Sequence, residues 1–283
     1  MEKRQARTLA VIIFGVLLAF AAARSSSRGR GELGELQIAM WNLNRVDNLQ
    51  MSYAYGWQQN GTTGEEAMNV WADMLTGSWA SEHYTTDEDG TRLYLRQFCD
   101  GKSIYHYIDW SGDWEQIQAP GQGGTAVPNL AWMTELGFDG DDIYELKRKD
   151  EDGTVELTCV FTPEYLDNVQ AGQLAQVEQS YAYYEKSGAD VSAIHTAALS
   201  VEQHKQMRYE DMTVTYTIDE NQVLREMEYT IRLVMPEIVQ DLSGNKMLGQ
   251  EREMQITLDM EIERYNQSGI TNKIEQCSNE MMY

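Results

Sequence analysis

The pentapeptide Asp-Glu-Asp-Gly-Thr occurs twice in the chain, at residues 87–91 and again at residues 150–154. Its carboxylates could bind a cation, or its Asp-Gly pair could form a hairpin turn. An EF-hand loop needs glycine at its sixth position and glutamate at its twelfth. In the first copy these positions are Arg92 and Phe98, and in the second they are Val155 and Phe161. Asp-Gly between alternating segments favours a type I′ turn, so we predict two hairpins and no metal site.

Other patterns that could support catalysis or metal binding are absent or weak. The chain contains no HExxH, GxSxG, P-loop or GxGxxG sequence. Residues 243–246 match S-x-x-K but fall in a predicted turn, and the acidic loop at residues 139–142 is also predicted to be a turn. The histidines have no zinc-binding spacing; they are His83, His106, His195 and His204. We therefore expect a protein that is not an enzyme, with no catalytic residues, no metal and no cofactor.

A positive feature is the composition of the predicted inward face of the strands, where many of the 15 methionines fall together with tyrosine and tryptophan. Methionine adapts to irregular contents, and tyrosine adds a broad apolar face with a polar tip. This face is either a core closed by helices or the wall of a cavity for an apolar ligand. The candidate ligand-binding residues are Met51, Tyr53, Tyr55, Trp57, Met212, Tyr216, Met227, Tyr229, Met254 and Met260. The helical residues expected to face them are Leu36, Met40, Leu174 and Val177.

The elements that must position these residues follow from periodicity. Apolar residues at helical spacing predict an amphipathic helix over residues 32–47. Alternation then predicts a strand over residues 49–57, and a meander follows over residues 66–118. Its predicted turns are Thr76-Gly77, Asp89-Gly90, Asp100-Gly101 and Ser111-Gly112.

The second half of the chain begins with a predicted hairpin at the second pentapeptide and continues with a helical segment over residues 163–206, starting at Thr162-Pro163-Glu164. Strands are predicted over residues 212–218, 227–233 and 254–262. Pro236 and Ser243-Gly244 are expected to break the chain before the last strand. Its alternate residues are apolar and acidic, which is typical of an antiparallel sheet with one solvated face.

Charge is distributed unevenly. The formal net charge is −23, yet residues 1–30 hold six of the 22 Lys and Arg residues and only one of the 45 Asp and Glu residues. From Gly31 onward 16 basic residues therefore face 44 acidic ones. A body this acidic repels phosphate backbones and anionic headgroups, so nucleic acid is excluded as a partner.

The N-terminus predicts export. Basic residues precede an apolar run over residues 9–23, which has the length of a signal-peptide core and is short for a membrane span. Residues 1–23 are therefore a signal peptide or an uncleaved signal anchor, and residues 24–31 a tether. Position 24 is arginine rather than a lipobox cysteine. The body is expected outside the cytoplasm, secreted or anchored at the outer face of the membrane.

The three cysteines are too few for a disulfide framework and lack CxxC spacing. Cys99 and Cys159 both fall in predicted strands. They could pair across the sheet, or they could be buried thiols that behave as small apolar residues.

The order of these elements resembles the LolA/LppX-like lipoprotein-carrier fold, which secreted Gram-positive relatives share. The resemblance covers residues 32–266. Two short sequence motifs also support it, residues 100–105 (DGKSIY) and residues 216–221 (YTIDEN). It implies an α+β fold, in which a curved antiparallel half-barrel sheet has helices on its concave face, with a helical insertion at about residues 163–206 and a C-terminal tail over residues 267–283. It also implies a hydrophobic cavity for acyl chains and no catalytic residues.

Two functions follow. The first is an exported, non-enzymatic binding protein whose partner is a lipid or another amphiphile. The second is a structural or sensory domain of the cell envelope, with a filled core, that docks an envelope protein. The continuity of an apolar pocket distinguishes the two.

Overall fold

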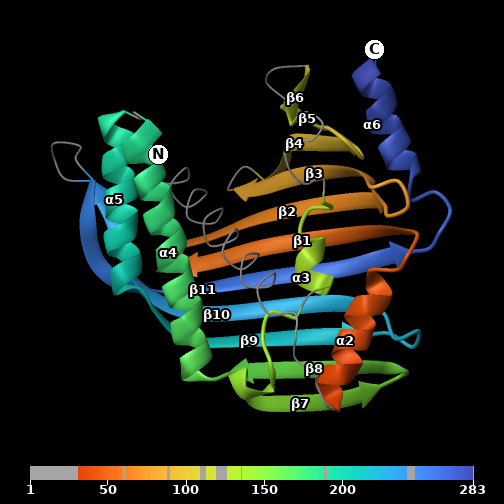
Figure 1. Cartoon of the computed structure of the whole chain (residues 1–283), viewed down its shortest axis with the longest axis horizontal. Coiled ribbons are helices and arrows are strands. Elements are labelled where there is room, and N and C mark those ends of the chain that lie inside the picture. The colour runs from red at the N-terminus through yellow and green to blue at the C-terminus, as the bar shows by residue number, and fades with distance from the viewer. Residues whose placement is uncertain are drawn as a thin grey trace.

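The computed structural model describes residues 31–59, 62–87, 90–108, 113–118, 126–134, 136–187, 190–240 and 246–282. Its centre is one antiparallel sheet of eleven strands in the order β6-β5-β4-β3-β2-β1-β11-β10-β9-β8-β7 (Figure 1). The sheet is not closed, because β6 and β7 remain its two edges. Helices accompany it, so the fold class is α+β, as the sequence predicted.

The strands are β1 (Asn48–Gln59), β2 (Thr62–Asp73), β3 (Ser78–Asp87), β4 (Gly90–Asp100), β5 (Ile104–Ile108), β6 (Trp114–Gln118), β7 (Ile143–Glu151), β8 (Thr154–Phe161), β9 (Arg208–Ile218), β10 (Leu224–Gln240) and β11 (Lys246–Tyr265). The helices are α2 (Glu32–Leu43), α3 (Leu130–Thr134), α4 (Pro163–Ser187), α5 (Val191–Gln206) and α6 (Asn272–Met282), with a 3-10 turn η1 (Gly140–Asp142) before β7.

The two copies of the repeated pentapeptide both join hairpin strands, but in different registers. In the second copy Glu151 pairs with Thr154, and the two residues between them have positive φ, 48° at Asp152 and 85° at Gly153. This is the predicted type I′ turn. In the first copy Asp87 pairs with Gly90, so the two residues between the strands are 88 and 89, which lie outside the described residues. The prediction of a turn centred on Asp89-Gly90 is therefore wrong by one residue.

Two of the remaining predicted turns are confirmed at Gly77 and Gly101, which have φ of 73° and 85°. At the second, the Asp100 carboxylate accepts hydrogen bonds from the backbone N–H groups of Lys102 and Ser103, at 2.8 and 2.7 Å. The predicted turns at Ser111-Gly112 and Ser243-Gly244 lie outside the described residues.

Pro236 does not break the chain, contrary to the prediction. Strand β10 continues through it to Gln240, with an irregularity in its pairing to β11 between Pro236 and Ile238. On the opposite side β9 ends where Arg208 pairs with Val234, so Pro236 lies beyond the neighbouring strand. A proline is tolerated where it interrupts no ladder, and here the strand has an edge and a bulge.

Helices α2 to α5 lie on one side of the sheet, and β10 and β11 curl at one end around α5 (Figure 1). This is the concave face. Helix α2 is shorter than the predicted residues 32–47, because it ends at Leu43 and the chain turns before β1; Val46 is nevertheless buried. The predicted helical segment is a pair of helices, α4 and α5.

Helix α6 lies on the opposite, convex face, where Ile274 and Cys277 pack against Ala80 and Phe98 of β3 and β4. No element was predicted there. Lys273 forms an ion pair with Glu82 at 2.6 Å, and Arg96 forms one with Glu280 at 2.6 Å. None of the helices in the described part of the chain is long and apolar enough to span a membrane.

The three cysteines are buried and form no disulfide, so the pairing of Cys99 with Cys159 is wrong. Cys99 belongs to β4 and Cys159 to β8, and six strands of the sheet separate them. Adjacent strands are about 4.8 Å apart, so the two thiols are far beyond the reach of a disulfide.

Candidate functional site

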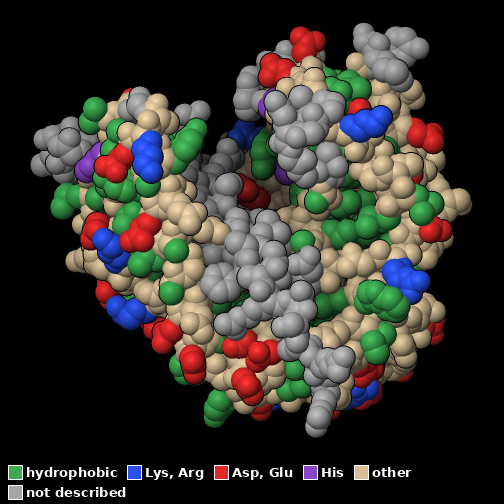
Figure 2. Space-filling model, viewed as in Figure 1, with side chains coloured by type: hydrophobic (Ala, Val, Ile, Leu, Met, Phe, Trp, Pro, Cys, Tyr) green, Lys and Arg blue, Asp and Glu red, His purple; other side chains and the backbone are tan. Residues whose placement is uncertain are grey.

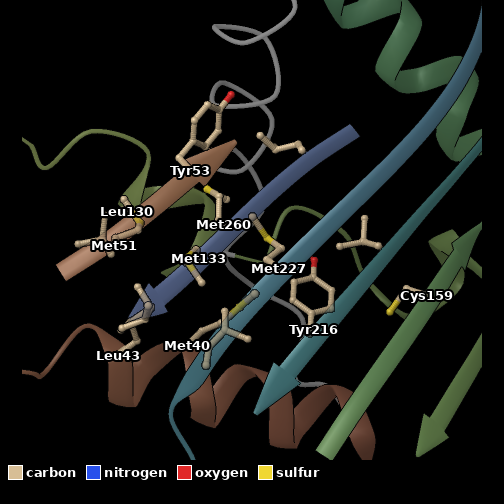
Figure 3. Close-up of a cluster of buried hydrophobic side chains, with 14 of the residues drawn as sticks. Met40, Leu43, Met51, Tyr53, Leu130, Met133, Cys159, Tyr216, Met227 and Met260 are labelled. Carbon is tan, nitrogen blue, oxygen red and sulfur yellow. The ribbon is translucent and has the colours of Figure 1, made fainter. Parts of the chain in front are cut away.

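The ten candidate ligand-binding residues lie on four adjacent strands in the order β1, β11, β10, β9, and they share the concave face. One row crosses all four strands, since Tyr53 pairs with Met260, Met260 with Met227, and Met227 with Tyr216. Figure 3 shows these side chains above α2. Residues from three separate parts of the sequence therefore form one continuous surface.

The neighbouring rows continue this surface toward α4 and α5. Tyr55 pairs with Leu258, which pairs with Tyr229. Trp57 begins the next row, and its ring lies over Gly64 of β2, where an added Cβ would come within 2.5 Å of the ring. The row that Trp57 begins is Trp57, Ile256, Ile231 and Met212, and Met254 pairs with Leu233 in the row beyond it.

Eight of the ten candidates are buried, with exposed fractions from 0 to 8%, whereas Trp57 and Tyr229 are half-buried. Leu36 and Met40 of α2 are buried in the same cluster, as predicted. Met133 of α3 is also buried there, and Figure 3 shows it between α2 and the strands. The face is therefore closed by α2 and α3 at one end.

Helix α4 presents a different stripe from the predicted one. Val177 is buried, but Leu174 is only half-buried, and Gln173 is fully buried in its place. The buried stripe runs through Leu166, Val169, Gln173 and Val177, which is helical spacing. An amide therefore faces the sheet where a leucine was expected.

The tyrosines of this face are neutral hydrogen-bonding groups. Burial raises the pKa of Tyr53 and Tyr55, and the carboxylate of Glu66 adds to the rise for both. Burial also raises the pKa of Tyr216 well above its ordinary value and that of Tyr229 to about 12, and the two hydroxyls interact with each other. These groups can therefore donate and accept hydrogen bonds without carrying charge.

On the other side of β1 the concave face becomes polar in the rows that start at Tyr53 and Tyr55, whereas the row of Ala72, Trp79 and Cys99 stays apolar and belongs to the main core. Tyr55 pairs with Glu66 of β2, Glu66 with Thr85 of β3, and Thr85 with Arg92 of β4. In the next row His83 lies beside Ser81 and Gln97, with its Nε2 3.0 Å from the Ser81 hydroxyl and 3.2 Å from the Gln97 Oε1. Burial lowers the pKa of His83 to about 4. It is therefore neutral near pH 7.

Sequence reasoning missed two polar residues of this site. Tyr209 is three residues from Met212, so regular alternation places its side chain on the opposite face. The pairing of β9 with β10 shifts between Arg232 and Leu233, however, and Tyr209 therefore pairs with Leu233 on the concave face. A bulge of this kind leaves no clear sequence signal. Gln173 could have been found by extending the helical spacing from Leu166 and Val169 without requiring an apolar residue.

The described residues hold no group of three or more His, Cys, Asp or Glu side chains placed to bind a metal ion. The acidic loop at residues 139–142 is a turn, as predicted. Asp139 accepts a hydrogen bond from the Asp141 N–H at 2.9 Å, and its own N–H donates to the Asp142 carboxylate at 3.0 Å. These carboxylates cap the 3-10 turn η1.

A polar pocket of about 580 Å³ lies where the second pentapeptide turn meets the β9–β10 turn. Asp219 lines it but is engaged: it accepts hydrogen bonds from the Tyr265 hydroxyl at 2.8 Å and from the N–H groups of Asn221 and Val223. Arg225 lies over the Tyr265 ring. These contacts fix the turn.

The chain was compared with known families, curated proteins and solved structures. No known family matches it, and no curated protein matches it. Solved structures do match the fold at low identity. A LolA superfamily protein from Nitrosomonas europaea has 10% identity and a TM-score of 0.26, with 83% of this chain and 95% of that chain covered.

LprF from Mycobacterium bovis has 12% identity and a TM-score of 0.29, with 80% of this chain and 90% of that chain covered. An uncharacterized conserved protein from Thermus thermophilus has 7% identity and a TM-score of 0.31, with 87% and 93% covered. The LolA superfamily that the sequence resembles is thus among the structural matches.

Proposed function

We propose that this protein is an exported, non-enzymatic binding protein that holds a lipid or another amphiphile against the concave face of its sheet. The observation that carries the proposal is the row of Tyr53, Met260, Met227 and Tyr216 across four adjacent strands. Methionine and tyrosine in one continuous surface suit an apolar ligand of irregular shape. The ten candidate residues are its binding wall.

The helices on this face support a site between them. Helix α2 packs near β9 and β10 at one end of the strands, and the α4–α5 pair packs on β9 to β11 at the other. Figure 2 shows the molecule hollowed between the α4–α5 pair and the β3–β5 part of the sheet. An acyl chain lying along the Met and Tyr rows would have its polar end near the tyrosine hydroxyls and the polar side of β1.

A second candidate is a cell-envelope domain with a filled core that docks a protein partner. The burial of eight of the ten residues favours it, because a packed core has the same low exposure. The two functions differ in how the wall responds to a change in volume.

Met254 distinguishes them. In a filled core, Met254→Ala should destabilise the protein by about 2–5 kcal/mol, and Met254→Trp should overpack it. At a cavity wall, Met254→Ala should cost less and mainly weaken uptake of an environment-sensitive lipid probe, while Met254→Trp should block uptake and leave the fold stable. Urea unfolding and probe fluorescence measure the two effects. Met247→Ala, on the same strand but half exposed, is the matched control.

Native mass spectrometry of the protein purified from its host should detect a co-purified lipid. The mass of the protein itself also shows whether residues 1–23 have been removed. Severe destabilisation by Met254→Ala, together with no binding of a fatty-acid or phospholipid probe by the wild type, would reject the carrier function in favour of the docking domain.

A further inference from the structure

Two polar side chains are enclosed on the concave side, and among the described residues the hydrogen-bonding neighbour of each is the other. Gln173 of α4 is fully buried, and neither its Nε2 nor its Oε1 has a partner with good geometry. The Tyr209 hydroxyl of β9 is also enclosed and has none. Buried polar groups in native proteins are almost always paired, so each exception calls for an explanation.

The fold brings these two groups together. Helix α4 packs over β9, with Val169 and Val177 buried on either side of Gln173. The shift in the β9–β10 pairing puts Tyr209 on the concave face, where it packs against the main core. Burial raises the pKa of Tyr209, and a weak hydrogen bond from the Gln173 amide offsets part of that rise, while Tyr55 adds to it; the Gln173 Oε1 and the proton of the Tyr209 hydroxyl remain available to a ligand. Tyr209 therefore lies on the face of β9 that α4 covers.

The chemistry of the pair restricts what it can bind. A glutamine amide offers both a donor and an acceptor, and a protonated tyrosine hydroxyl can do either. The nearest charged residues along β9 are engaged or point elsewhere: Arg208 pairs with Glu251 at 3.0 Å, and Asp211 pairs with Arg232. Burying an ionised group beside Gln173 would be strongly unfavourable unless the ligand brought its own counter-charge.

We propose that Gln173 and Tyr209 form a polar subsite within the lipid-binding face, which binds an uncharged hydrogen-bonding group of an amphiphile, such as a carboxylic ester. The subsite rests on the proposed function, since it requires a ligand on the concave face. The neutral group of the ligand would bind between α4 and β9, and its apolar chain would lie along the Met and Tyr rows.

The test uses two probes of the same chain length. Methyl palmitate carries one neutral ester, and hexadecane carries no polar atom; both are delivered from cyclodextrin to displace N-phenyl-1-naphthylamine from the full chain after its own lipids are extracted. In the wild type the ester should displace the dye at lower concentration than the alkane. Gln173→Leu should weaken displacement by the ester about tenfold, as expected for one hydrogen bond, and leave the alkane unchanged.

Tyr209→Phe removes a single oxygen atom and should show the same selective loss. It decides the question alone if Gln173→Leu does not fold. Gln179→Leu on the exposed face of α4 and Tyr183→Phe at its exposed end are the matched controls, and neither should affect either probe.

The outcomes separate the subsite from the proposed function. An unchanged response to the ester in both variants would mean that water serves these groups, and would overturn the subsite while the binding function stands. An equal loss for both probes would also overturn it, because the residues would then only support packing. If the wild type binds neither probe, the subsite and the proposed function both fail.

Discussion

The two sides of strand β1 differ in what the concave face carries. Toward β9 the row that starts at Tyr53 stays apolar through Met260 and Met227. Toward β4 the same row passes through Met68 to His83, and the next row passes through Glu66 to Thr85. The sheet is continuous across β1, so the difference lies in what packs on each part.

The helices explain this difference. On the β9–β11 side α2, α4 and α5 pack on the concave face, which must therefore be apolar. On the β2–β4 side α6 packs on the convex face, where Ala80, Phe98 and the half-buried Trp71 form a separate small core. This part of the sheet therefore buries apolar side chains on both faces, because Ala72, Trp79 and Cys99 on its concave face belong to the main core.

The largest effect should come from the apolar side. Met227 is fully buried between Met260 and Tyr216, so Met227→Ala should destabilise the protein more than any other substitution named here, measured by urea unfolding. Met68 is the matched residue on the other side, with Tyr53 and His83 as its cross-strand neighbours. Met68→Ala should cost less, because the cavity it leaves has fewer apolar walls.

Equal costs for Met227→Ala and Met68→Ala would show that the two sides of β1 are packed alike and would break the comparison. A cost of about 2–5 kcal/mol for Met227→Ala would fit the filled core, and a smaller cost would fit the adaptable wall of the proposed binding protein.

The polar side should make stability depend on pH. His83 has a pKa of about 4 in the folded protein against an ordinary 6.5, because burial disfavours its charged form. The unfolded chain therefore binds the proton first as the pH falls. Stability should be complete above pH 6.5 and decline toward pH 4, by about 1.4 kcal/mol per unit and on the order of 3 kcal/mol in total.

Urea midpoints of the wild type and His83→Gln, measured between pH 7 and pH 4, isolate this contribution, since the titration of the many carboxylates is common to both proteins. His83→Gln should lose the extra slope in this window. His195→Gln, at an exposed site on α5, should keep it. Parallel curves for the wild type and His83→Gln would mean that His83 is hydrated and outside the polar cluster.

The smallest effect should come from the repeated pentapeptide at the sheet's hairpins. Asp150 is exposed and pairs with Arg148 at 2.7 Å, so Asp150→Asn should leave the melting temperature unchanged within error, in calcium and in EDTA alike. Asp87→Asn should behave in the same way. A calcium-dependent rise in the wild-type melting temperature, abolished by either substitution, would show a cation site at these turns.

The sequence by itself determined most local structure, because local rules decide it. Alternation in residues 212–218 and 254–262 specified both the strands and their inward faces, since a pleated strand turns successive side chains to opposite sides. The Asp152-Gly153 turn followed from the need for positive φ, and the start of α4 followed from Thr162 and Pro163. The ten candidate residues were therefore identified as one face before their strands could be ordered.

Tertiary structure alone decided the features that depend on a neighbouring element. The bulge that turns Tyr209 inward exists because β10 pairs with β9 in a shifted register. Pro236 remains in a strand because β9 ends before it reaches that position. Gln173 is buried because α4 lies over Tyr209, and no apolar pattern marks an amide for burial. Local sequence fixes which way a side chain points relative to its own backbone, whereas burial depends on the segment that covers it, and that segment is distant in the sequence.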